Sequence, residues 1–215
     1  MSIIAIDGTF ASGKGTLGRR LAAHFGFAYL DTGKLYRAAA KRAIDTGTAL
    51  DDGAGCAKLA AAIMPEDLDD PALKSGVVGA AASEIAVHTD VRATLLAYQR
   101  NFAANPPSGA KGAVLDGRDI GTVICPDADV KLYVDAAPAE RARRRHTELL
   151  GYGEDISYTE VLAQLKVRDG RDKGRAEAPL KPAANAHLLD TTNLSIDAAF
   201  ERAASLIEAV LRPRA

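Results

Sequence analysis

Apolar runs of strand length alternate along this chain with segments that have the periodicity of helices. The runs that predict buried strands lie at residues 3–7, 27–30, 113–116, 130–136 and 187–190. After the first run, Leu17 and Leu21 lie four residues apart, which predicts a helix that stops near Gly26. The alternation predicts an α/β fold, with a parallel sheet of about five strands and helices on both faces. Ligands of such a sheet bind at the carboxyl ends of its strands, where we find Gly8, Asp31, Asp116 and Asp190.

The stretch from residue 48 to residue 104 departs from this alternation. It is rich in alanine, contains no convincing strand, and is interrupted at 64–71 by "MPEDLDDP" with its two prolines. We interpret it as a helical excursion, after which the loop "NPPSGAKG" at 105–112 returns the chain to the sheet. For a chain of 215 residues we expect a single domain, residues 1–215, with a core of 1–47 and 105–215 and an insert of about 48–104.

Composition and charge narrow the classes of partner. Hydrophobic residues make up 47% of the chain and charged residues 26%, and the formal net charge is −1. We therefore expect neither nucleic acid nor a membrane surface as a partner, and any basic site must be local. The two cysteines, Cys56 and Cys125, lack the spacing of a disulfide framework or a zinc site. The first apolar run is too short for a signal peptide or a membrane span, so we expect a cytoplasmic protein. We also expect a monomer.

The segment "GTFASGKGT" at 8–16 has the spacing of a phosphate-binding loop, because four residues separate Gly8 from Gly13 and Lys14. Its glycines let successive N–H groups point at an anion, and the following helix presents its positive end to the same charge. One position departs, since a glycine stands directly after the lysine where the pattern has Ser or Thr. A plain turn is the alternative, but the strand before and the helix after favour phosphate binding. The expected binding residues are Gly8, Thr9, Phe10, Ala11, Ser12, Gly13, Lys14, Gly15 and Thr16.

The segment "DTGKLYR" at 31–37 opens a predicted helix at the rim of the sheet. Asp31 or Thr32 could simply cap that helix. Tyr36 and Arg37 weigh against capping alone, because an arginine at this place can hold a second phosphate in a bidentate contact.

The segment "LDGRDIGTVICPDADVKLYVDA" at 115–136 places two charged residues directly after a buried strand. Asp116 ends the strand, at a position from which proteins with a phosphate loop commonly handle the metal. Gly117 frees the backbone so that Arg118 and Asp119 can turn into the cleft. A salt bridge between these two neighbours is the alternative, but adjacent residues in an extended chain point to opposite sides.

The segment "ERARRRH" at 140–146 carries four arginines within five residues. On a helix, Arg141, Arg144 and Arg145 share one face, whereas Arg143 points elsewhere. Such a face needs an anion, and the triphosphate of a bound nucleotide is the simplest partner. A solvated basic face is the alternative.

The segment "VRDGRDKGR" at 167–175 repeats this arrangement, and its stripe of one helix face consists of Arg168, Arg171, Asp172 and Arg175. Gly170 and Gly174 cost this helix roughly 1 kcal/mol each relative to alanine. The two glycines therefore indicate either that this segment moves on ligand binding or that the helix ends here.

Together these segments resemble the bacterial cytidylate kinase family of nucleoside monophosphate kinases along nearly the whole chain. The resemblance is carried, in the family's order, by "IAIDG", "SGKGT", "LDTGKLYR", "LDGRDIGTVICPDADVKLYVDA", "RDGRDKGRAEAPLKPAANAHLLDTT" and "LSID". It implies a P-loop NTPase-type sheet, a monophosphate-binding insert over about 48–104 and a lid over about 138–160. The family also has glycine after the lysine. Residues 48–80 are too short and too helical for the small antiparallel sheet that many members carry in the insert.

The resemblance implies transfer of the γ-phosphoryl group of ATP to CMP or dCMP. It implies that Mg²⁺ is held through phosphates and water, with Asp116 as the single candidate among the side chains. The implied catalytic residues are Lys14, Arg118, Arg141, Arg144 and Arg145. The implied substrate-binding residues are Thr32, Tyr36, Arg37, Ser83, Arg92, Arg118, Asp119, Arg168, Asp172 and Arg175, with Ser83 and Arg92 near the cytosine.

Three other functions stay open from the sequence. Another small-molecule P-loop kinase, of the adenylate or dephospho-coenzyme A type, would share the phosphate loop but not the paired "LDGRD" and "RDGRD" segments. A nucleotide-dependent switch of the GTPase kind would carry an Asn-Lys-x-Asp segment, which this sequence lacks. A basic nucleic-acid binder fits poorly with a net charge of −1.

Overall fold

The core of the computed structural model, which describes residues 1–211, is one parallel sheet with the strand order β2-β3-β1-β4-β5. Its strands are β1 (Ser2–Gly8), β2 (Ala28–Asp31), β3 (Gly112–Gly117), β4 (Val130–Asp135) and β5 (His187–Asp190). All five predicted strands are confirmed, each within one or two residues of its expected ends. The register sets Asp7 beside Gly117 and Asp31 beside Asp116. The carboxyl ends of the central strands therefore meet at one edge.

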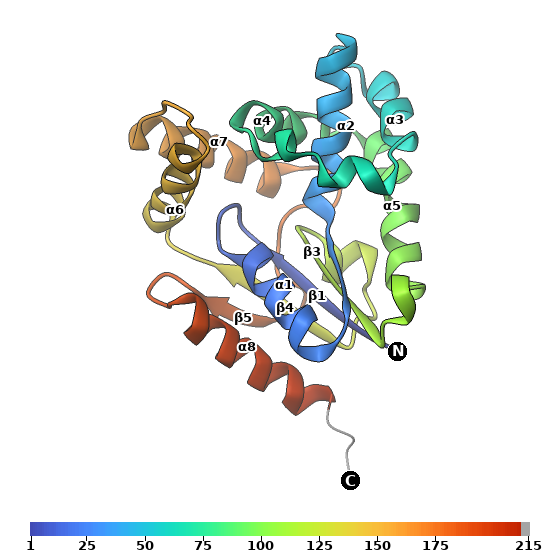
Figure 1. Ribbon diagram of the computed structural model, residues 1–215, viewed down its shortest axis with the longest axis vertical. Helices are drawn as coiled ribbons and strands as arrows, with labels where there is room; N and C mark the ends of the chain where they lie inside the picture. Colours follow the sequence, from blue (N-terminus) through green and yellow to red (C-terminus); the bar gives the residue numbers. More distant parts are fainter. Residues whose placement is uncertain (212–215) are drawn as a thin grey trace.

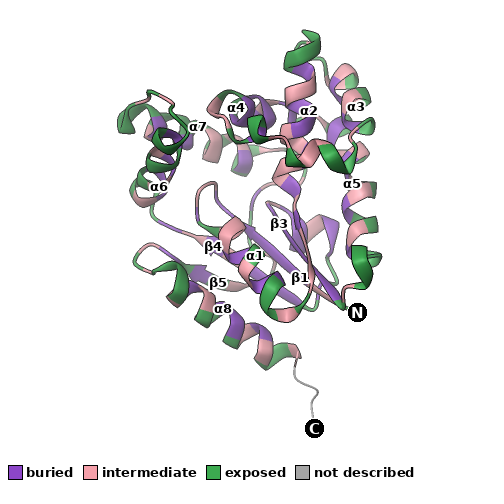
Figure 2. Ribbon diagram, viewed as in Figure 1, coloured by how far each residue is buried: buried purple, intermediate pink, exposed green. Residues whose placement is uncertain are grey.

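Alternating residues of the strands face two separate layers of helices. Ile4 and Ile6 of β1 pack in one cluster with α1 (Lys14–Phe25) and α8 (Ile196–Leu211). Ala5 packs in the other cluster, with α2 (Thr32–Thr46) and α5 (Thr89–Ala104). In Figure 1, α1 and α8 lie at the centre and the lower left, whereas α2 and α5 lie at the top and the right. The central strands β1, β3 and β4 are buried on both faces, as expected of a parallel sheet (Figure 2), whereas the edge strands β2 and β5 are partly exposed.

The excursion contains helices only, as the sequence predicted. Within residues 48–104, all of which the structure describes, no strand occurs. Its elements are α3 (Gly53–Ala61), the 3₁₀ helices η1 (Pro65–Asp69) and η2 (Pro71–Lys74), α4 (Gly76–Ile85) and α5. The two prolines of "MPEDLDDP" begin the two 3₁₀ helices, because proline has a helical φ and needs no N–H partner in the first turn.

The second half of the chain continues the alternation. A short 3₁₀ helix, η3 (Pro107–Gly109), precedes β3, and a single π-helical turn, η4 (Ile120–Ile124), follows it. Helices α6 (Pro138–Gly151) and α7 (Tyr158–Gly174) lie between β4 and β5. Gly174 is the last residue of α7, so one of the two glycines marks the end of this helix, while Gly170 lies inside it. No helix within the described residues is long and apolar enough to cross a membrane.

Two glycines of the phosphate loop are required by their surroundings. A Cβ on Gly8 would lie 2.0 Å from the carbonyl oxygen of Val134 on the neighbouring strand, which no other residue could tolerate. Gly13 precedes α1 with a φ of 92°, which favours glycine. The chain can therefore leave β1 and begin α1 within five residues, and the loop between them stays at the carboxyl edge of the sheet.

Candidate active site

A cavity of about 650 Å³ opens over the carboxyl edge of the sheet. The phosphate loop lines one side of it with Phe10, Ala11 and 13–16. The side-chain oxygen of Ser12 is buried and has no hydrogen-bond partner among the described residues, which marks the loop as shaped for a ligand. The sequence predicted this loop, and the structure brings most of it to the cavity.

Gly8, Thr9 and Ser12 are the exceptions in that loop. Gly8 is the last residue of β1, and the hydroxyl of Thr9 donates to the carboxylate of Asp135 at 2.5 Å. None of the three residues lines this cavity. Gly8 and Thr9 shape the base of the loop, and the contact of all three residues with ATP stays a prediction.

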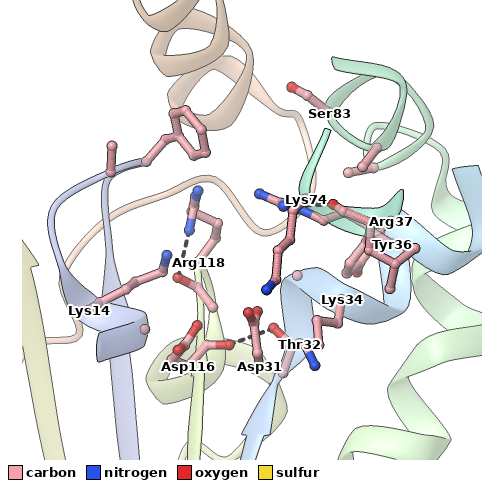
Figure 3. Close-up of a pocket in the computed structure, with 18 of the residues that line it drawn as sticks. Lys14, Asp31, Thr32, Lys34, Tyr36, Arg37, Lys74, Ser83, Asp116 and Arg118 are labelled. Carbon is pink, nitrogen blue, oxygen red and sulfur yellow. Dashed lines mark hydrogen bonds between the residues drawn. The ribbon is translucent and has the colours of Figure 1, made fainter. Parts of the chain in front are cut away.

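Lys14 and the acidic ends of two strands share the floor of the cavity. Lys14, Asp31 and Asp116 point into the same space (Figure 3). Desolvation of the ammonium group, with Arg118 nearby, lowers the pKa of Lys14 to about 8. A phosphate placed here would favour the charged form of Lys14, because an opposite charge stabilises it.

Asp116 is the carboxylate best placed to meet a metal ion. It accepts a hydrogen bond from the hydroxyl of Tyr29, and burial together with the neighbouring charge of Asp31 raises its pKa to about 6. Within residues 1–211, no group of three metal-ligating side chains occurs. Two carboxylate side chains fit Mg²⁺, which proteins usually hold through one or two carboxylates together with substrate phosphates and water.

The first residues of α2 form the next wall. Thr32 donates through its hydroxyl to the carbonyl oxygen of Asp116 at 2.7 Å, and Asp31 makes no side-chain capping bond. The interpretation of this segment as a helix cap alone is therefore wrong. Arg37 lines the cavity and donates to the carbonyl of Leu73 at 2.8 Å, which ties α2 to the insert.

Arg118 and Asp119 both line the cavity, yet they do not pair with each other. Arg118 donates to Asp172 of α7 at 2.8 Å, and Asp119 forms an ion pair with Arg92 of α5. The structure thus excludes the salt bridge between neighbours and supports the expectation that the two side chains diverge. Burial raises the pKa of Asp119, although Arg92 opposes that shift.

The far end of the cavity can make hydrogen bonds to a flat polar ligand. Ser83 lies across the cavity from Lys14 (Figure 3), and its buried hydroxyl has no partner among the described residues. Arg92 lies over the ring of Tyr36, with 6.0 Å from its guanidinium carbon to the ring centre. The structure therefore brings Tyr36, Ser83, Arg92 and Asp119 to one cavity from three separate helices and the segment after β3.

Helix α7 contributes the residues of its predicted stripe unequally. Arg168 and Asp172 line the cavity, as does Arg175, which directly follows the end of the helix, whereas the half-exposed Arg171 lies 3.6 Å from Glu84. The guanidinium of Arg168 lies 4.1 Å above the ring of Phe10, and burial lowers its pKa to about 9. The Nε of Arg168 and the Nη2 of Arg175 have no hydrogen-bond partner among the described residues, although the latter lies 3.9 Å from the carboxylate of Asp172, so both can donate to an anion.

The arginines of α6 also divide. Arg143, Arg144 and Arg145 line a second cavity, of about 490 Å³, on the other side of the phosphate loop, so the expectation that Arg143 points elsewhere is wrong. Arg141 lines neither cavity, and its side chain is almost completely buried. It forms a bidentate ion pair with Asp169, with distances of 3.0 and 2.6 Å, and donates to the carbonyl of Phe10. The expectation that Arg141 joins Arg144 and Arg145 over a triphosphate is therefore not met, because Asp169 already satisfies its charge.

Sequence reasoning missed several residues of the two cavities. Lys34 and Lys74 add positive charge to the first one. Lys34 stands inside the segment "DTGKLYR" and could have been found there, but nothing in the sequence singles out Lys74. The second cavity has a partly apolar wall that follows β5, formed by Thr191, Leu194, Ser195, Ile196 and Ala199.

A phosphate loop between two cavities, with arginines from several elements around it, defines a P-loop kinase of small phosphorylated substrates. A model of the family described as cytidylate kinase matches residues 4–209. The chain is 55% identical over 206 residues to the cytidylate kinase of Afipia carboxidovorans, covering 96% of this chain and 97% of that one. It is 52% identical over 212 residues to the cytidylate kinase of Rhizobium meliloti, covering 99% and 98% of the two chains. This protein belongs to the cytidylate kinase family.

A solved structure agrees with the fold. An uncharacterized protein from Eubacterium ventriosum superposes with a TM-score of 0.55 at 14% identity, covering 97% of this chain and 99% of that one. At this level of identity the likeness supports the fold alone.

Proposed function

We propose that this protein transfers the γ-phosphoryl group of ATP to the 5′ phosphate of CMP or dCMP. One observation carries the proposal. The larger cavity has cationic groups at Lys14 and Arg118, and the hydroxyl of Ser83 lies across it from Lys14 (Figure 3). Arg92 and Asp119, which form an ion pair with each other, add hydrogen-bonding groups to the same cavity. A nucleoside monophosphate needs both kinds of group, one for its phosphate and one for its base.

The chemistry of the far end favours cytosine. Cytosine presents an amino donor at C4 with acceptors at N3 and O2, whereas uracil presents an oxygen at C4 and a donor at N3. An ionised Asp119 can only accept, so it suits the cytosine amino group, and Arg92 can donate to the two acceptors. The ion pair between Asp119 and Arg92 holds both groups at this end of the cavity before a base arrives.

ATP would lie on the other side of the phosphate loop. The loop amides and Lys14 bind its phosphates in this proposal, and the partly apolar second cavity takes its nucleoside. Arg37 and Arg118, joined by Arg175, grip the acceptor phosphate, while Arg168 and Asp172 lie nearer the ribose. Asp116, with Asp31 beside it, would hold Mg²⁺ together with phosphates and water, and the ion would supply charge neutralisation between donor and acceptor.

Catalysis by this arrangement needs no strong base. The second pKa of a phosphate monoester is near 6, so the acceptor is already largely ionised at neutral pH. What the protein supplies is alignment and positive charge around the transferred group. Arg144 and Arg145 of α6 belong to the lid over 138–160, whose closure keeps water from accepting the phosphoryl group.

An assay of ADP release with different acceptors tests the proposal. We expect activity with CMP and dCMP to exceed that with UMP, AMP or shikimate. Lys14→Ala lowers kcat by roughly 10²-fold or more, since it removes a charge that stabilises the transition state. The matched control is Lys111→Ala, on the exposed turn before β3, which leaves kcat unchanged. Preference for AMP or shikimate, or a fully active Lys14→Ala enzyme with wild-type Tm, would overturn the assignment.

A further inference from the structure

Asp7 is a buried carboxylate at the edge of the active site that contacts neither cavity. It lies on β1, one residue before Gly8, and only 3% of its surface is exposed. Its two oxygens accept hydrogen bonds from the backbone N–H groups of Ile120, at 2.7 Å, and Gly121, at 2.8 Å. The two bonds join segments that are 113 and 114 residues apart.

The two N–H groups belong to the turn that directly follows Arg118 and Asp119. Ile120 and Gly121 are the first residues of η4, and the first N–H groups of a helical turn have no partner within it. Asp119 precedes the turn but makes no side-chain capping bond to it. The carboxylate of Asp7 therefore supplies from another strand the partners that the turn lacks.

Holding this turn fixes the backbone on both sides of the pair. On one side Gly117 ends β3, beside Asp7 in the sheet. On the other side Asp7 anchors the two residues after the pair. The backbone of Arg118 and Asp119 is thus fixed on both sides. From it, the side chain of Arg118 reaches Asp172 and that of Asp119 reaches Arg92, on two different helices.

We infer that Asp7 is a positioning residue for base selection, acting through the turn at Ile120 and Gly121 to aim Asp119 at the base. This inference rests on the proposed function, in which Asp119 accepts from cytosine. Asp7 itself touches no substrate. A carboxylate suits this task because it has two acceptor oxygens and no donor when ionised.

The test is Asp7→Asn, measured with CMP and UMP. The amide has one acceptor oxygen, so one of the two N–H groups loses its partner and faces an NH₂ group instead. We expect the ratio of kcat/KM for CMP over UMP to fall at least roughly tenfold, because a buried N–H is left unpaired and the turn shifts. The KM for ATP changes less than about twofold, since the turn does not line the ATP side.

A double-mutant cycle separates positioning from general damage. If Asp7 acts through Asp119, Asp7→Asn lowers the ratio far less in an Asp119→Asn background than in the wild type. Additive losses overturn the inference. Hydrogen exchange gives a readout without activity: the amides of Ile120 and Gly121 exchange faster in Asp7→Asn, and unchanged protection there also overturns it.

Two further variants serve as a control and as an alternative to Asp7→Asn. Asp129→Asn is the matched control, because Asp129 also accepts from a β1 amide, that of Ile3 at 2.8 Å, but is exposed and lines neither cavity. It leaves the base ratio unchanged. Should Asp7→Asn fail to fold, Gly121→Ala displaces the same turn, since its Cβ would lie 3.1 Å from the Lys131 side chain and 3.4 Å from Asp7. An unchanged ratio in Gly121→Ala overturns the inference.

The same data distinguish this inference from the proposed function. A wild-type enzyme without preference for CMP over UMP contradicts the proposed function, and the exchange rates still report on the turn. A selective wild type whose ratio falls in Asp119→Asn but not in Asp7→Asn upholds the proposed function and overturns the role of Asp7.

Discussion

At the scale of single residues, the site is organised by buried arginines that have specific carboxylate partners. Arg118 pairs with Asp172, Arg92 with Asp119 and Arg141 with Asp169. Each pair joins two elements, so each fixes the direction of a long side chain that would otherwise lose much entropy on binding a ligand. The site is therefore largely preorganised.

Asp119 is the residue on which base preference rests in our proposal. We expect Asp119→Asn to narrow the preference for CMP over UMP by at least roughly tenfold, about 1.4 kcal/mol. The reason is that an amide can turn its NH₂ group toward the uracil oxygen, which a carboxylate repels. The measurement is kcat/KM for both nucleotides, with Asp127→Asn, on the exposed turn before β4, as the matched control. An unchanged ratio would mean that Asp119 does not read the base.

At the scale of elements, helices α6 and α7 meet the insert through a few polar contacts. Glu154, in the loop between them, accepts from the backbone N–H of Gly76 at the start of α4, at 2.7 Å. Arg145 donates to the carbonyl of Lys74 at 3.3 Å, and Arg168 to that of Gly79 at 3.1 Å. These contacts join α6, α7 and the loop between them to the insert, and they must break for the two parts to separate.

The arginines of α6 have different consequences when they are removed. We expect at least one of the variants Arg144→Ala and Arg145→Ala to lose mainly kcat, because a transition-state arginine is worth roughly 10³–10⁵ in rate in phosphoryl transfer. Arg202→Ala, at an exposed position of α8, is the control. Steady-state kinetics with saturating ATP and CMP decide the matter, and wild-type kcat in both variants would show that neither arginine takes part in catalysis.

Arg141→Ala acts on stability instead. It leaves Asp169 without its bidentate partner, and breaking a buried ion pair in this way costs about 3–5 kcal/mol. Urea denaturation followed by circular dichroism measures the loss in the free energy of unfolding. A variant as stable as the wild type but slow in turnover would place Arg141 with the catalytic arginines after all.

At the scale of the whole molecule, the order of the strands concentrates charge at one edge of the sheet. β1 and β3 are adjacent in its middle, so Asp7, Asp116 and the phosphate loop come together there. Asp31 follows from β2, beside Asp116. Several carboxylates thus share a desolvated region in which Lys14 provides positive charge. Keeping them ionised there lowers the stability of the fold.

The cost of ionising a buried carboxylate predicts that the stability of the fold depends on pH. Burial and Asp31 raise the pKa of Asp116 from 3.8 to about 6, so the folded state binds more protons than the unfolded state between these values. The stability of the wild type falls as pH rises through this window and stays lower above it. Asp116→Asn has no carboxylate to ionise at this position. Its free energy of unfolding minus that of the wild type therefore increases by about 2–3 kcal/mol from pH 4 to pH 8.

Urea unfolding of both proteins at pH 4, 6 and 8 measures this difference. Asp127→Asn, whose carboxylate is exposed, provides the control with a constant difference. A difference for Asp116→Asn that is equally constant across the range would contradict the shifted pKa.

Local pattern in the sequence determined most of the fold and the phosphate side of the site. Strand, glycine loop and helix follow one another within 8–16 and its flanks, so the position of Lys14 follows from neighbours in the chain. The five strands were found for the same reason, since each is a continuous apolar run. Helical spacing also placed Arg168 and Asp172 on one face correctly, whereas Arg171 of the same predicted stripe does not line the cavity and Arg175 lies just beyond the end of the helix.

Only the tertiary structure decided which partner each charge has and which side chains reach a ligand. Helical spacing set Arg141 level with Arg144 and Arg145, but Asp169 on another helix removed it from the cavity. The contact of Asp7 with Ile120 spans 113 residues, and Lys74 enters the cavity because the insert folds over the sheet. Periodicity relates residues within one element, whereas ion pairs and cavities form between elements, and their distances exist only once the sheet has brought those elements together.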